Sequence, residues 1–578
     1  MADPTNTQIA EALDELGDLN ELDGAVIHRV VAYRNAAKTV REASSSIAAL
    51  ARDGRATELP GIGATIQEKV LALADTGEIP ALVKLRAKFP PGLVAMTRLP
   101  GLGPKRARRL FDELGIDSLP ALREAADDHR IRDLKGFGAK AEESLLAALD
   151  AFDETGPARR IVLHRALDVG EQLVASLRAN PAADRVELAG SARRMTESVK
   201  DLDIVATAAD PAALASFAAN LPMVETSSQP GENAVRLRTH TGVQVDLRIV
   251  EPDQFGNVLQ HLTGSKEHNM ALRDLAVRRG LHISEYGVLD DASGETHRCA
   301  TEADVYGLLG MEYIEPELRE NRGELEAAQS GRLPELVTLE DLRGDLHSHT
   351  FASDGTASVT EMGNAALAAG YEYLAITDHS ASMGFGAEVS DSELLRQIEL
   401  IREADAEIAG IQLLAGSEVN ILPDGSLDYP DQLLTQLDWV VASVHTSFRM
   451  NSEQMTARII RAIESPFVDC IGHLSGRKIE HRPPYEFDFE AILDACVRTG
   501  TLLEINSNPD RRDLSEVHAR AAAAAGLPLV INTDSHRVDG FAVARYGVAT
   551  ARRAWLSAPQ IANTKAWADV AALRSRPR

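Results

Sequence analysis

Residues 341–578 alternate seven short apolar segments with stretches of helical periodicity, and this alternation limits the possible folds more than any other feature of the chain. Strands separated by helices pair in parallel, because a parallel connection needs a crossover long enough to hold a helix. We therefore expect a barrel-like α/β domain here. The seven segments are RGDLHSH, YLAITDH, QLLAGSEV, WVVASVH, VDCIGH, TLLEINS and PLVINTDSH.

Side chains that bind metal ions stand at or just beyond the ends of six of these predicted strands. Catalytic residues of α/β barrels gather at the carboxyl ends of strands, so we expect these groups to meet. Nine of them are enough for three metal ions, and mixed imidazole and carboxylate ligands suit Mn²⁺ or Zn²⁺ better than Mg²⁺ alone. The alternative is that each histidine is a structural hydrogen-bonding group. The nine residues are His347, His349, Asp354, His379, Glu418, His445, His473, Asp534 and His536.

Residues 1–150 contain one short pattern three times, as LPGIGATIQEKV (59–70), LPGLGPKRARRL (99–110) and LKGFGAKAEESL (134–145). A Gly-x-Gly turn lets a helix begin close to a ligand, and the amides at the helix N-terminus attract phosphate. Residues 79–111 add eight Lys and Arg side chains and no acid, although the whole chain has a net charge of −27. A single copy would indicate only helix packing, but three copies predict contact with the DNA backbone. The candidate contacts are Gly61, Gly63, Gly101, Gly103, Lys105, Gly136 and Gly138.

Two predicted strands between residues 200 and 250 carry three carboxylates. Asp201 and Asp203 are two residues apart in DLDIV, so on a strand they would face the same side. Asp246, in VQVDLRIV, would complete the group from a second strand. Mg²⁺ prefers such oxygen ligands, and a pair of ions of this kind supports phosphoryl transfer. The alternative for an isolated Asp-x-Asp is a solvated turn.

The order of motifs across residues 1–325 resembles family X of the DNA polymerases, whose best-known member is DNA polymerase beta. The motifs are AYRNAA (32–37), the three helix-hairpin-helix units, GSARR, DLD, VDLR, TGSKEHNMALR (263–273), ISEYG and YIEPELRE. The resemblance implies that Asp201, Asp203 and Asp246 hold Mg²⁺ or Mn²⁺ and are catalytic. It implies that Ser191 and Arg194 hold the triphosphate of an incoming nucleotide. It also assigns nucleotide contacts to Arg160, Gly264, Asn269 and Arg273.

The same resemblance covers the N-terminal block, which is similar to the lyase domain of that polymerase. Lys69 matches the lysine that forms a Schiff base with an abasic sugar, which would make it catalytic. Thr65 replaces a supporting lysine of the family pattern. The alternative role for Lys69 is an ordinary contact with phosphate.

The C-terminal motifs DLHSHT, SDG, TDH, GSEV, SVH, GH and TDSH resemble the PHP (polymerase and histidinol phosphatase) domain, a distorted (βα)₇ barrel. The resemblance implies hydrolysis of phosphoesters with zinc, manganese or iron. It makes all nine residues at the strand ends metal ligands.

We therefore expect a multidomain chain: an all-α helix-hairpin-helix region, an α+β nucleotidyltransferase polymerase core, and a C-terminal α/β (βα)₇ PHP barrel. The expected divisions are a lyase-like helical domain with the first helix-hairpin-helix (1–80), a second helix-hairpin-helix region (81–150), a palm (151–250), a thumb-like nucleotide-selection domain (251–325), a linker (326–340) and the PHP domain (341–578).

The two resemblances in this order predict a DNA-directed DNA polymerase that fills short gaps in base excision repair. Its substrates would be gapped or primed duplex DNA and dNTPs. The PHP domain would act as a 3′–5′ exonuclease, or as a 3′-phosphatase or abasic-site endonuclease. The alternative is a DNA-bound PHP phosphoesterase whose polymerase half only positions DNA. Three widely spaced cysteines, a polar N-terminus and the lack of a long apolar run predict a soluble cytoplasmic protein with no membrane partner. We also expect a monomer.

Overall fold

The computed structural model describes residues 3–573 apart from 44, 98, 100, 101, 135, 152–159, 230, 232 and 383–387. Contacts between residues divide the chain into two compact units. The first contains residues 1–161, 165–189 and 199–255, and the second contains residues 162–164, 190–198 and 256–578.

The N-terminal part of the first unit is helical. Helix α1 (Asn6–Leu22) begins with a capping box, in which Thr5 and Gln8 each accept a hydrogen bond from the other's backbone amide. Its leucines at helical spacing enter a core that all the helices of this region share. The remaining helices are α2 (Ile27–Glu42), α3 (Ile47–Arg52), α4 (Ala64–Thr76), α5 (Pro80–Arg86), α6 (Pro91–Thr97), α7 (Pro104–Leu114), α8 (Leu119–Asp127) and α9 (Gly138–Ala151).

Glycine turns precede three of these helices, as the repeated pattern predicts. Helix α4 begins after Gly63, α7 begins after Gly103, and α9 begins at Gly138. The φ angles of Gly61 and Gly136 are +78° and +90°, a conformation in which any side chain would be strained. The tight turns therefore depend on glycine at these positions.

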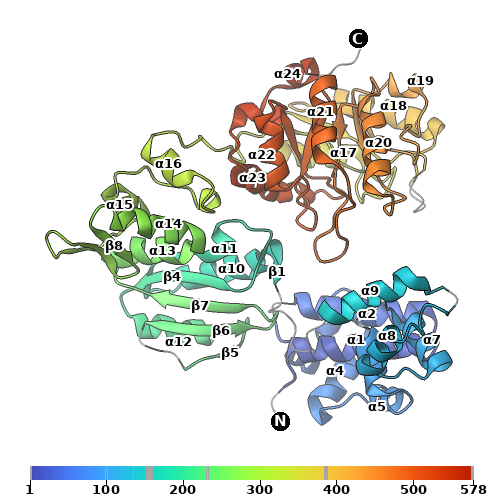
Figure 1. The fold of residues 1–578 in the computed structure, drawn as a ribbon, viewed down its shortest axis with the longest axis horizontal. Helices are drawn as coiled ribbons and strands as arrows, with labels where there is room; N and C mark the ends of the chain where they lie inside the picture. The colour runs from blue at the N-terminus through green and yellow to red at the C-terminus, as the bar shows by residue number, and fades with distance from the viewer. Residues whose placement is uncertain are drawn as a thin grey trace. The chain divides into compact units, whose positions relative to one another are not determined.

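A five-stranded mixed sheet forms the rest of the first unit (Figure 1). Strands β4 (Leu202–Ala208) and β7 (Gln244–Ile249) are parallel neighbours, and Asp203 lies opposite Asp246 in their register. Helix α12 (Pro211–Ala219) packs against the sheet. The other strands, all antiparallel to their neighbours, are β2 (Ala183–Leu188), β5 (Val224–Ser227) and β6 (Ala234–Thr239).

Residues 272–336 of the second unit contribute to a hydrophobic core separate from that of the barrel. Helices α13 (Phe255–Thr263), α14 (Lys266–Val277) and α15 (Glu302–Leu308) accompany a small antiparallel sheet of β8 (Leu281–Ser284), β9 (Gly287–Asp290) and β10 (Thr296–His297). The segment expected as a linker (326–340) begins inside helix α16 (Glu324–Gln329). The rest of that segment buries Leu336 and Val337, and the Val337 amide donates to the Leu556 carbonyl.

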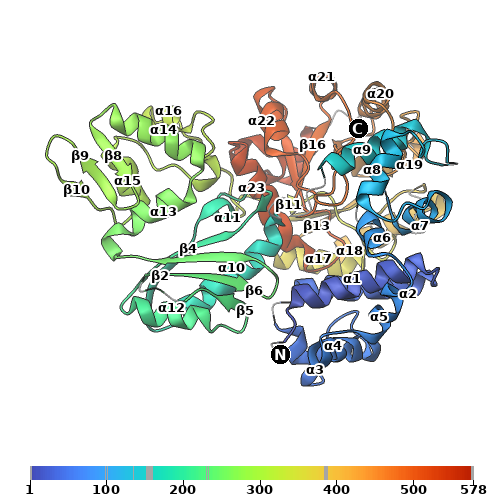
Figure 2. The same cartoon turned by 60° about the horizontal axis from the view of Figure 1, so that its bottom comes forward.

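A seven-stranded parallel sheet builds the remainder of the second unit, in strand order β11 to β17. A parallel bridge between Ser348 and Ser535 links its two ends into a barrel. Helices α17 (Val359–Ala368), α18 (Asp391–Glu407), α20 (Ser452–Ile463), α21 (Phe489–Thr499), α22 (Glu516–Ala524) and α23 (Ala544–Arg553) surround it in both views (Figures 1 and 2). The strands are β11 (Gly344–Asp345), β12 (Tyr373–Ile376), β13 (Gln412–Asn420), β14 (Trp439–Ser443), β15 (Cys470–Ile471), β16 (Leu502–Asn506) and β17 (Leu529–Asn532).

Alternate residues of the barrel strands enter two different cores. Tyr373 and Trp439 belong to one cluster with residues of α24 (Trp567–Ala572). Leu374 and Val440, one position further along, belong to the larger cluster shared with the surrounding helices. Strands buried on both faces explain why the sequence shows near-continuous apolar runs. Within the described part of the chain, no helix combines the length and the apolar character needed to cross a membrane.

Candidate metal centre and nucleotide-binding residues

The ends of the barrel strands carry the nine predicted metal-binding side chains, and the structure brings all nine together. Strand β13 positions Glu418 directly, whereas the others lie in the segments that follow β11, β12, β14, β15 and β17. Asp534 and His473 have positive φ angles of 54° and 29°. Such backbone strain concentrates at functional sites, where the surrounding structure holds it in place.

Glu418 occupies the centre of the cluster. Its Oε2 lies 2.8 Å from His379 Nδ1 and 3.4 Å from His347 Nε2. Its Oε1 lies 2.9 Å from His473 Nε2 and 3.1 Å from His445 Nε2. One fully buried carboxylate thus faces four imidazoles.

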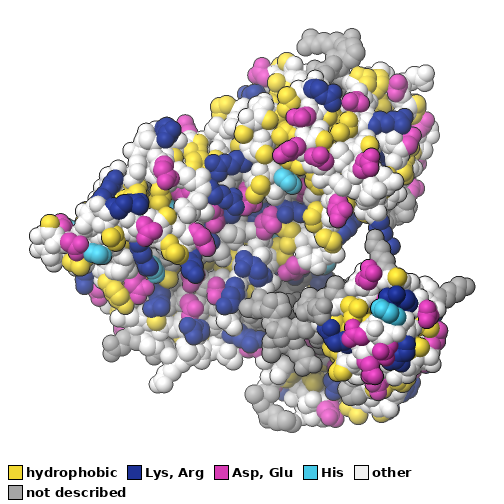
Figure 3. Space-filling view, viewed as in Figure 1, with side chains coloured by type: hydrophobic (Ala, Val, Ile, Leu, Met, Phe, Trp, Pro, Cys, Tyr) yellow, Lys and Arg dark blue, Asp and Glu magenta, His cyan; other side chains and the backbone are white. Residues whose placement is uncertain are grey.

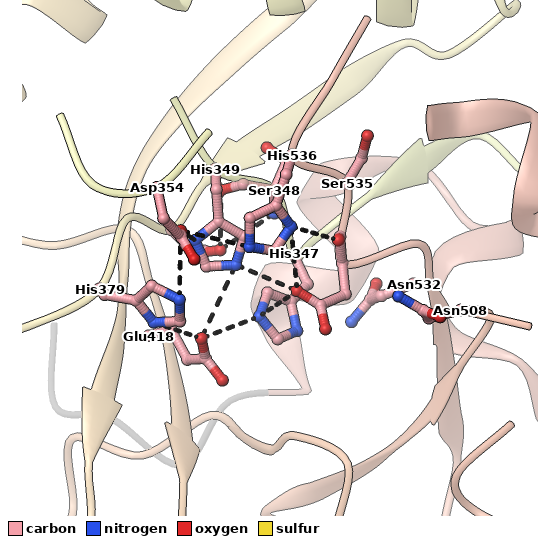
Figure 4. Close-up of polar contacts among 12 residues, drawn as sticks. His347, Ser348, His349, Asp354, His379, Glu418, Asn508, Asn532, Ser535 and His536 are labelled. Carbon is pink, nitrogen blue, oxygen red and sulfur yellow. Dashed lines mark hydrogen bonds and ion pairs between the residues drawn. The ribbon is translucent and has the colours of Figure 1, made fainter. Parts of the chain in front are cut away.

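Two aspartates extend the cluster. Asp354 Oδ1 lies 3.3 Å from His379 Nε2 and 3.2 Å from His536 Nε2. Asp534 Oδ1 lies 3.1 Å from His349 Nε2. In Figure 4 the carboxylate of Asp354 and the rings of His349, His379 and His536 point toward one another. Among the described residues, three groups place one ligand atom from each member within 4.8 Å of the others: His349, Asp354, His379 and His536; His347, His349 and Asp534; and His379, Glu418 and His445.

The donor atoms of this cluster fit divalent ions. Both carboxylate oxygens of Glu418, His347 Nε2 and His379 Nδ1 are buried and make no contact of hydrogen-bond geometry among the described atoms, although Glu418 Oε2 and His379 Nδ1 are only 2.8 Å apart. Buried polar atoms normally have partners, so several unpartnered ones at one place indicate a ligand. The unpartnered atoms are nitrogen and oxygen donors of the kind that Mn²⁺ and Zn²⁺ take.

Charge and burial oppose each other in this cluster. Burial raises the pKa of Glu418, but His445, His347 and His379 outweigh it and hold that pKa well below its usual range. Burial and the neighbouring His536 and His379 lower the pKa of His349 to about 3. Burial lowers the pKa of His379, but Glu418 and Asp354 outweigh it and raise that pKa to about 10. Ionised carboxylates and neutral imidazoles are the states that bind metal ions, so metal binding here would release protons from histidines such as His379.

Residues behind the cluster fix the orientation of its ligands, and the sequence did not single them out. Glu504 Oε1 lies 2.7 Å from His347 Nδ1, and Glu504 Oε2 accepts a hydrogen bond from the His473 amide at 2.9 Å. Asn506 donates to both Glu504 and Asp534. Carboxylates that hold the second nitrogen of a ligating histidine set its tautomer. The available signal was a lone acid inside an apolar strand, as in LLEIN.

Two cations, Arg511 and Lys478, lie near Asp534 of the cluster. Arg511 Nε is 3.7 Å from Asp534 Oδ2, and its buried Nη1 has no hydrogen-bond partner among the described atoms. Lys478 is exposed, yet partial burial and the nearby guanidinium groups of Arg511 and Arg482 lower its pKa. Like charges gathered at one place favour an anion between them.

Two of the three polymerase carboxylates lie on neighbouring strands of one sheet, and the third directly precedes one of those strands. Asp203 is the second residue of β4 and faces Asp246 of β7 across the register, whereas Asp201 precedes β4 instead of lying within it. Asp246 Oδ1 accepts from Arg236 Nε at 2.8 Å. The groups of ligand atoms found within 4.8 Å in the described chain do not include these carboxylates. Carboxylates repel one another unless a cation lies among them.

Of the predicted nucleotide contacts, only Arg160 lies in the first unit. The others lie in the second unit, near Arg194 or near Asn269. Arg194 Nε pairs with Glu320 Oε1 at 3.1 Å, its Nη1 donates to the Thr263 carbonyl, and a Cβ on Gly264 would lie 3.3 Å from that Nη1. Asn269 donates to the His261 carbonyl at 2.8 Å, and Arg273 lies 3.3 Å from the His261 ring. Ser191 is in helix α11 (Gly190–Arg193), and Arg160 is exposed just before β1 (Ile161–Val162).

The predicted DNA contacts of the helical region are exposed. Gly61, Gly63, Gly103, Lys105 and Gly136 lie at the surface, whereas Gly101 lies outside the described residues. Gly138, with a φ of +62°, is the first residue of α9. Lys69, in α4, is half-buried, and its ammonium lies 5.8 Å from the centre of the Tyr33 ring.

Much of the predicted cationic stretch is neutralised in the structure. Arg86 pairs with Glu15, Lys88 with Asp23, Arg108 with Asp112 and Arg109 with Glu113. Acidic and basic side chains are interspersed over the face drawn in Figure 3. Residues 79–111 are therefore less uniformly basic in the fold than in the sequence.

Comparison with known proteins identifies the parts of the chain. A family model for the DNA polymerase beta thumb matches residues 258–320, and one for the PHP domain matches residues 345–508. A helix-hairpin-helix domain model matches residues 4–79, and a SAM-like helix-hairpin-helix tandem model matches residues 94–151. The fold and these matches define a family X polymerase joined to a PHP barrel.

Whole-chain similarity narrows this class to one family. The DNA polymerase/3′-5′ exonuclease PolX of Bacillus subtilis (strain 168) is 35% identical over 570 residues, which is 98% of this chain and 99% of that protein. The chain belongs to this bacterial PolX family. A probable phosphatase of Caldanaerobacter subterraneus subsp. tengcongensis is 32% identical over 203 residues, which is 33% of this chain and 75% of that protein. A probable phosphatase of Photobacterium profundum is 34% identical over 169 residues, 28% of this chain and 63% of that protein.

Proposed function

We propose that the barrel of this family X DNA polymerase removes nucleotides from DNA 3′ ends, with the nine clustered side chains as ligands for up to three Mn²⁺ or Zn²⁺ ions. The observation that carries this proposal is the convergence of nine histidine and carboxylate side chains, several of whose buried donor atoms have no other partner among the described residues. Bound ions of this kind supply Lewis acidity and an activated water for attack on phosphorus. The same chemistry would serve a 3′-phosphatase or an abasic-site endonuclease.

Different residues around that centre would have different roles. Glu418 faces four imidazoles and would serve as a carboxylate ligand, while Glu504 holds the ring of His347 in one orientation. Arg511 and Lys478 would bind the phosphodiester, because they place cationic groups beside Asp534. A guanidinium offers paired donors to two phosphate oxygens, which neutralises charge and orients the phosphorus.

In the polymerase half, Asp201, Asp203 and Asp246 would hold Mg²⁺ or Mn²⁺ and act on the primer 3′ hydroxyl and the dNTP. The opposed positions of Asp203 and Asp246 on parallel strands support this role. Ser191, Arg194, Arg160 and Gly264 would contact the triphosphate. For Arg194 this means leaving Glu320 for a more highly charged partner. Asn269 and Arg273 would contact the nascent base pair.

The glycine turns and Lys105 would bind the backbone of gapped or primed duplex DNA during repair synthesis. Lys69 would contact the 5′ side of the gap, either through phosphate or as a Schiff-base lysine near Tyr33. The three free thiols fit a reducing compartment such as the cytoplasm, where the protein would act as a monomer.

The test uses a one-nucleotide-gapped duplex labelled on the primer strand. We expect the chelated protein to be inactive, Mn²⁺ to restore shortening, and Mg²⁺ or Mn²⁺ with dNTPs to restore extension. His445→Ala should lose metal measured by mass spectrometry, whereas His282→Ala, an exposed histidine paired with Asp291, should retain it. Shortening that survives complete chelation would contradict the metal centre. Shortening without any extension would favour the PHP phosphoesterase whose polymerase half only positions DNA.

A further inference from the structure

Three arginines of the barrel domain contact the short segment 190–198, and all of these residues belong to the second compact unit. Arg477 pairs with both carboxylate oxygens of Glu197, at 2.5 and 3.2 Å. Arg512 Nη1 donates to the Met195 carbonyl at 3.0 Å, and Arg553 Nη1 donates to the Arg194 carbonyl at 2.8 Å. The barrel domain therefore holds this segment through one side chain and two backbone carbonyls.

The arginines are themselves fixed in place. Arg512 is 1% exposed, and its Nε and Nη2 donate to Thr550 Oγ1 at 3.1 and 3.0 Å. Burial lowers the pKa of Arg512 to about 10. Keeping this guanidinium charged inside the protein therefore reduces the stability of the fold. Arg477 Nε donates to the Arg511 carbonyl at 2.9 Å, and its Nη2 donates to the Arg512 carbonyl. Buried guanidinium groups held at several points have little freedom to follow a moving partner.

Arg553 holds more than the backbone of Arg194. It is 6% exposed and pairs with Glu320 at 2.9 Å, the same carboxylate that pairs with the Arg194 guanidinium. A second pair joins Arg553 to Glu516 of α22 at 3.2 Å. Arg553 thus fixes both the main chain of Arg194 and the carboxylate that the Arg194 side chain contacts.

The segment held in this way contains Ser191 and Arg194, the proposed triphosphate contacts. Met195 has a φ of +56°, a left-handed conformation that is strained for methionine. An external hydrogen bond to the Met195 carbonyl stabilises that conformation. A binding loop that is already ordered binds its ligand more tightly, because less conformational entropy is lost on binding.

We propose that Arg477, Arg512 and Arg553 of the PHP domain are positioning residues for nucleotide binding by the polymerase. They hold the backbone of residues 190–198 in place, so that Ser191 is positioned for the triphosphate and the Arg194 side chain can exchange Glu320 for it. The inference rests on the proposed triphosphate role of those two residues. The PHP domain then has a part in synthesis that does not involve its own metal centre.

The experiment compares Glu197→Gln, Arg477→Gln and the double variant in the full-length protein. Glu197→Gln is the cleaner change, because it leaves the backbone contacts of Arg477 intact. Arg498→Gln is the matched control, since this exposed arginine of α21 pairs with Glu464. The readouts are KM and kcat for the next correct dNTP on a one-nucleotide gap, shortening of a labelled primer without dNTPs, and the melting temperature.

We expect each single variant to raise KM for the dNTP about three- to tenfold, with kcat within about twofold, because the binding loop is displaced while the carboxylates stay in place. The double variant should be no worse than Arg477→Gln, because both changes remove one interaction. Primer shortening by Glu197→Gln and all activities of Arg498→Gln should match the wild type.

Arg194→Gln separates the two levels of the proposal. If it leaves KM for the dNTP unchanged, the segment does not bind triphosphate and the inference fails with that role. If it raises KM while Glu197→Gln and Arg477→Gln do not, the triphosphate role stands and the positioning role is wrong. Equal losses of synthesis, shortening and melting temperature in the variants would assign the contacts to general stability and overturn the inference.

Discussion

Glu302, in helix α15, holds two arginines with one buried carboxylate. Its Oε1 lies 2.6 Å from Arg319 Nη1, and its Oε2 lies 2.6 Å from Arg193 Nη2. Burial raises the pKa of Glu302, but Arg319 and Arg193 outweigh it and lower that pKa to about 2. Arg319 is fully buried, so its charge depends on this carboxylate for compensation.

Replacing Glu302 with Gln should destabilise the second unit by about 3–4 kcal/mol at pH 7.5, because it leaves a buried guanidinium without its countercharge. The folded pKa of Glu302 lies below the unfolded value, so its contribution is complete above about pH 4.5 and is lost as pH falls toward 2. The gap between wild type and Glu302→Gln should therefore be about 1–2 kcal/mol smaller at pH 3.5. Calorimetric melting at both pH values measures it. A gap that does not change with pH would contradict the assigned pKa.

At this scale the sequence predicted the residues that share a pattern and missed those that do not. The nine side chains at the barrel ends stand at or after the carboxyl ends of repeated strands, and the structure brings them together. Glu504 and Asp345 also stand in barrel strands, but each occurs as a single acid without a repeated neighbour. Burial raises the pKa of Asp345 to about 7, which only the folded environment determines. The pairing of Arg194 with Glu320, 126 residues away in the chain, left no local signal either.

At the scale of elements, the helix-hairpin-helix units follow the sequence closely. Glycine precedes or begins α4, α7 and α9, and the turns at Gly61 and Gly136 need it because only glycine takes the required positive φ without strain. The sequence did not predict the ion pairs of residues 79–111, because some of them join helices that the sequence alone cannot place side by side. Arg86 of α5, for example, pairs with Glu15 of α1. What remains available to DNA includes exposed Lys105 in the first turn of α7.

The salt dependence of binding to gapped DNA tests whether the N-terminus of α7 contacts phosphate. Lys105→Ala should reduce the slope of log K against log salt by about 1, because one phosphate contact releases about one counterion. Arg86→Ala is the matched control in the same cationic stretch, since Arg86 already pairs with Glu15 and should leave the slope unchanged. Fluorescence anisotropy at several salt concentrations gives both slopes. An unchanged slope in Lys105→Ala would show that the α7 terminus does not touch the backbone.

At the scale of the whole molecule, the β-then-α rhythm was sufficient to predict the barrel. All seven predicted strands form, in sequence order and parallel. The division into two compact units was not predictable, because it depends on contacts between segments far apart in the chain. Residues 190–198 are the clearest case: they follow β2 of the first unit but make their contacts in the second, through arginines such as Arg512, 317 residues away.

The two sets of proposed metal ligands lie in different compact units, so their activities should separate. Asp201, Asp203 and Asp246 are in the first unit, and the nine ligands of the barrel are in the second. Asp201→Ala with Asp203→Ala should reduce extension by more than about a hundredfold and spare shortening, because two of the carboxylates proposed to hold the polymerase ions are removed. His347→Ala with His349→Ala should do the reverse. Each double variant is the control for the other on one gapped substrate, with folding checked by circular dichroism. Joint loss of both activities in either correctly folded variant would mean that synthesis and degradation share one centre.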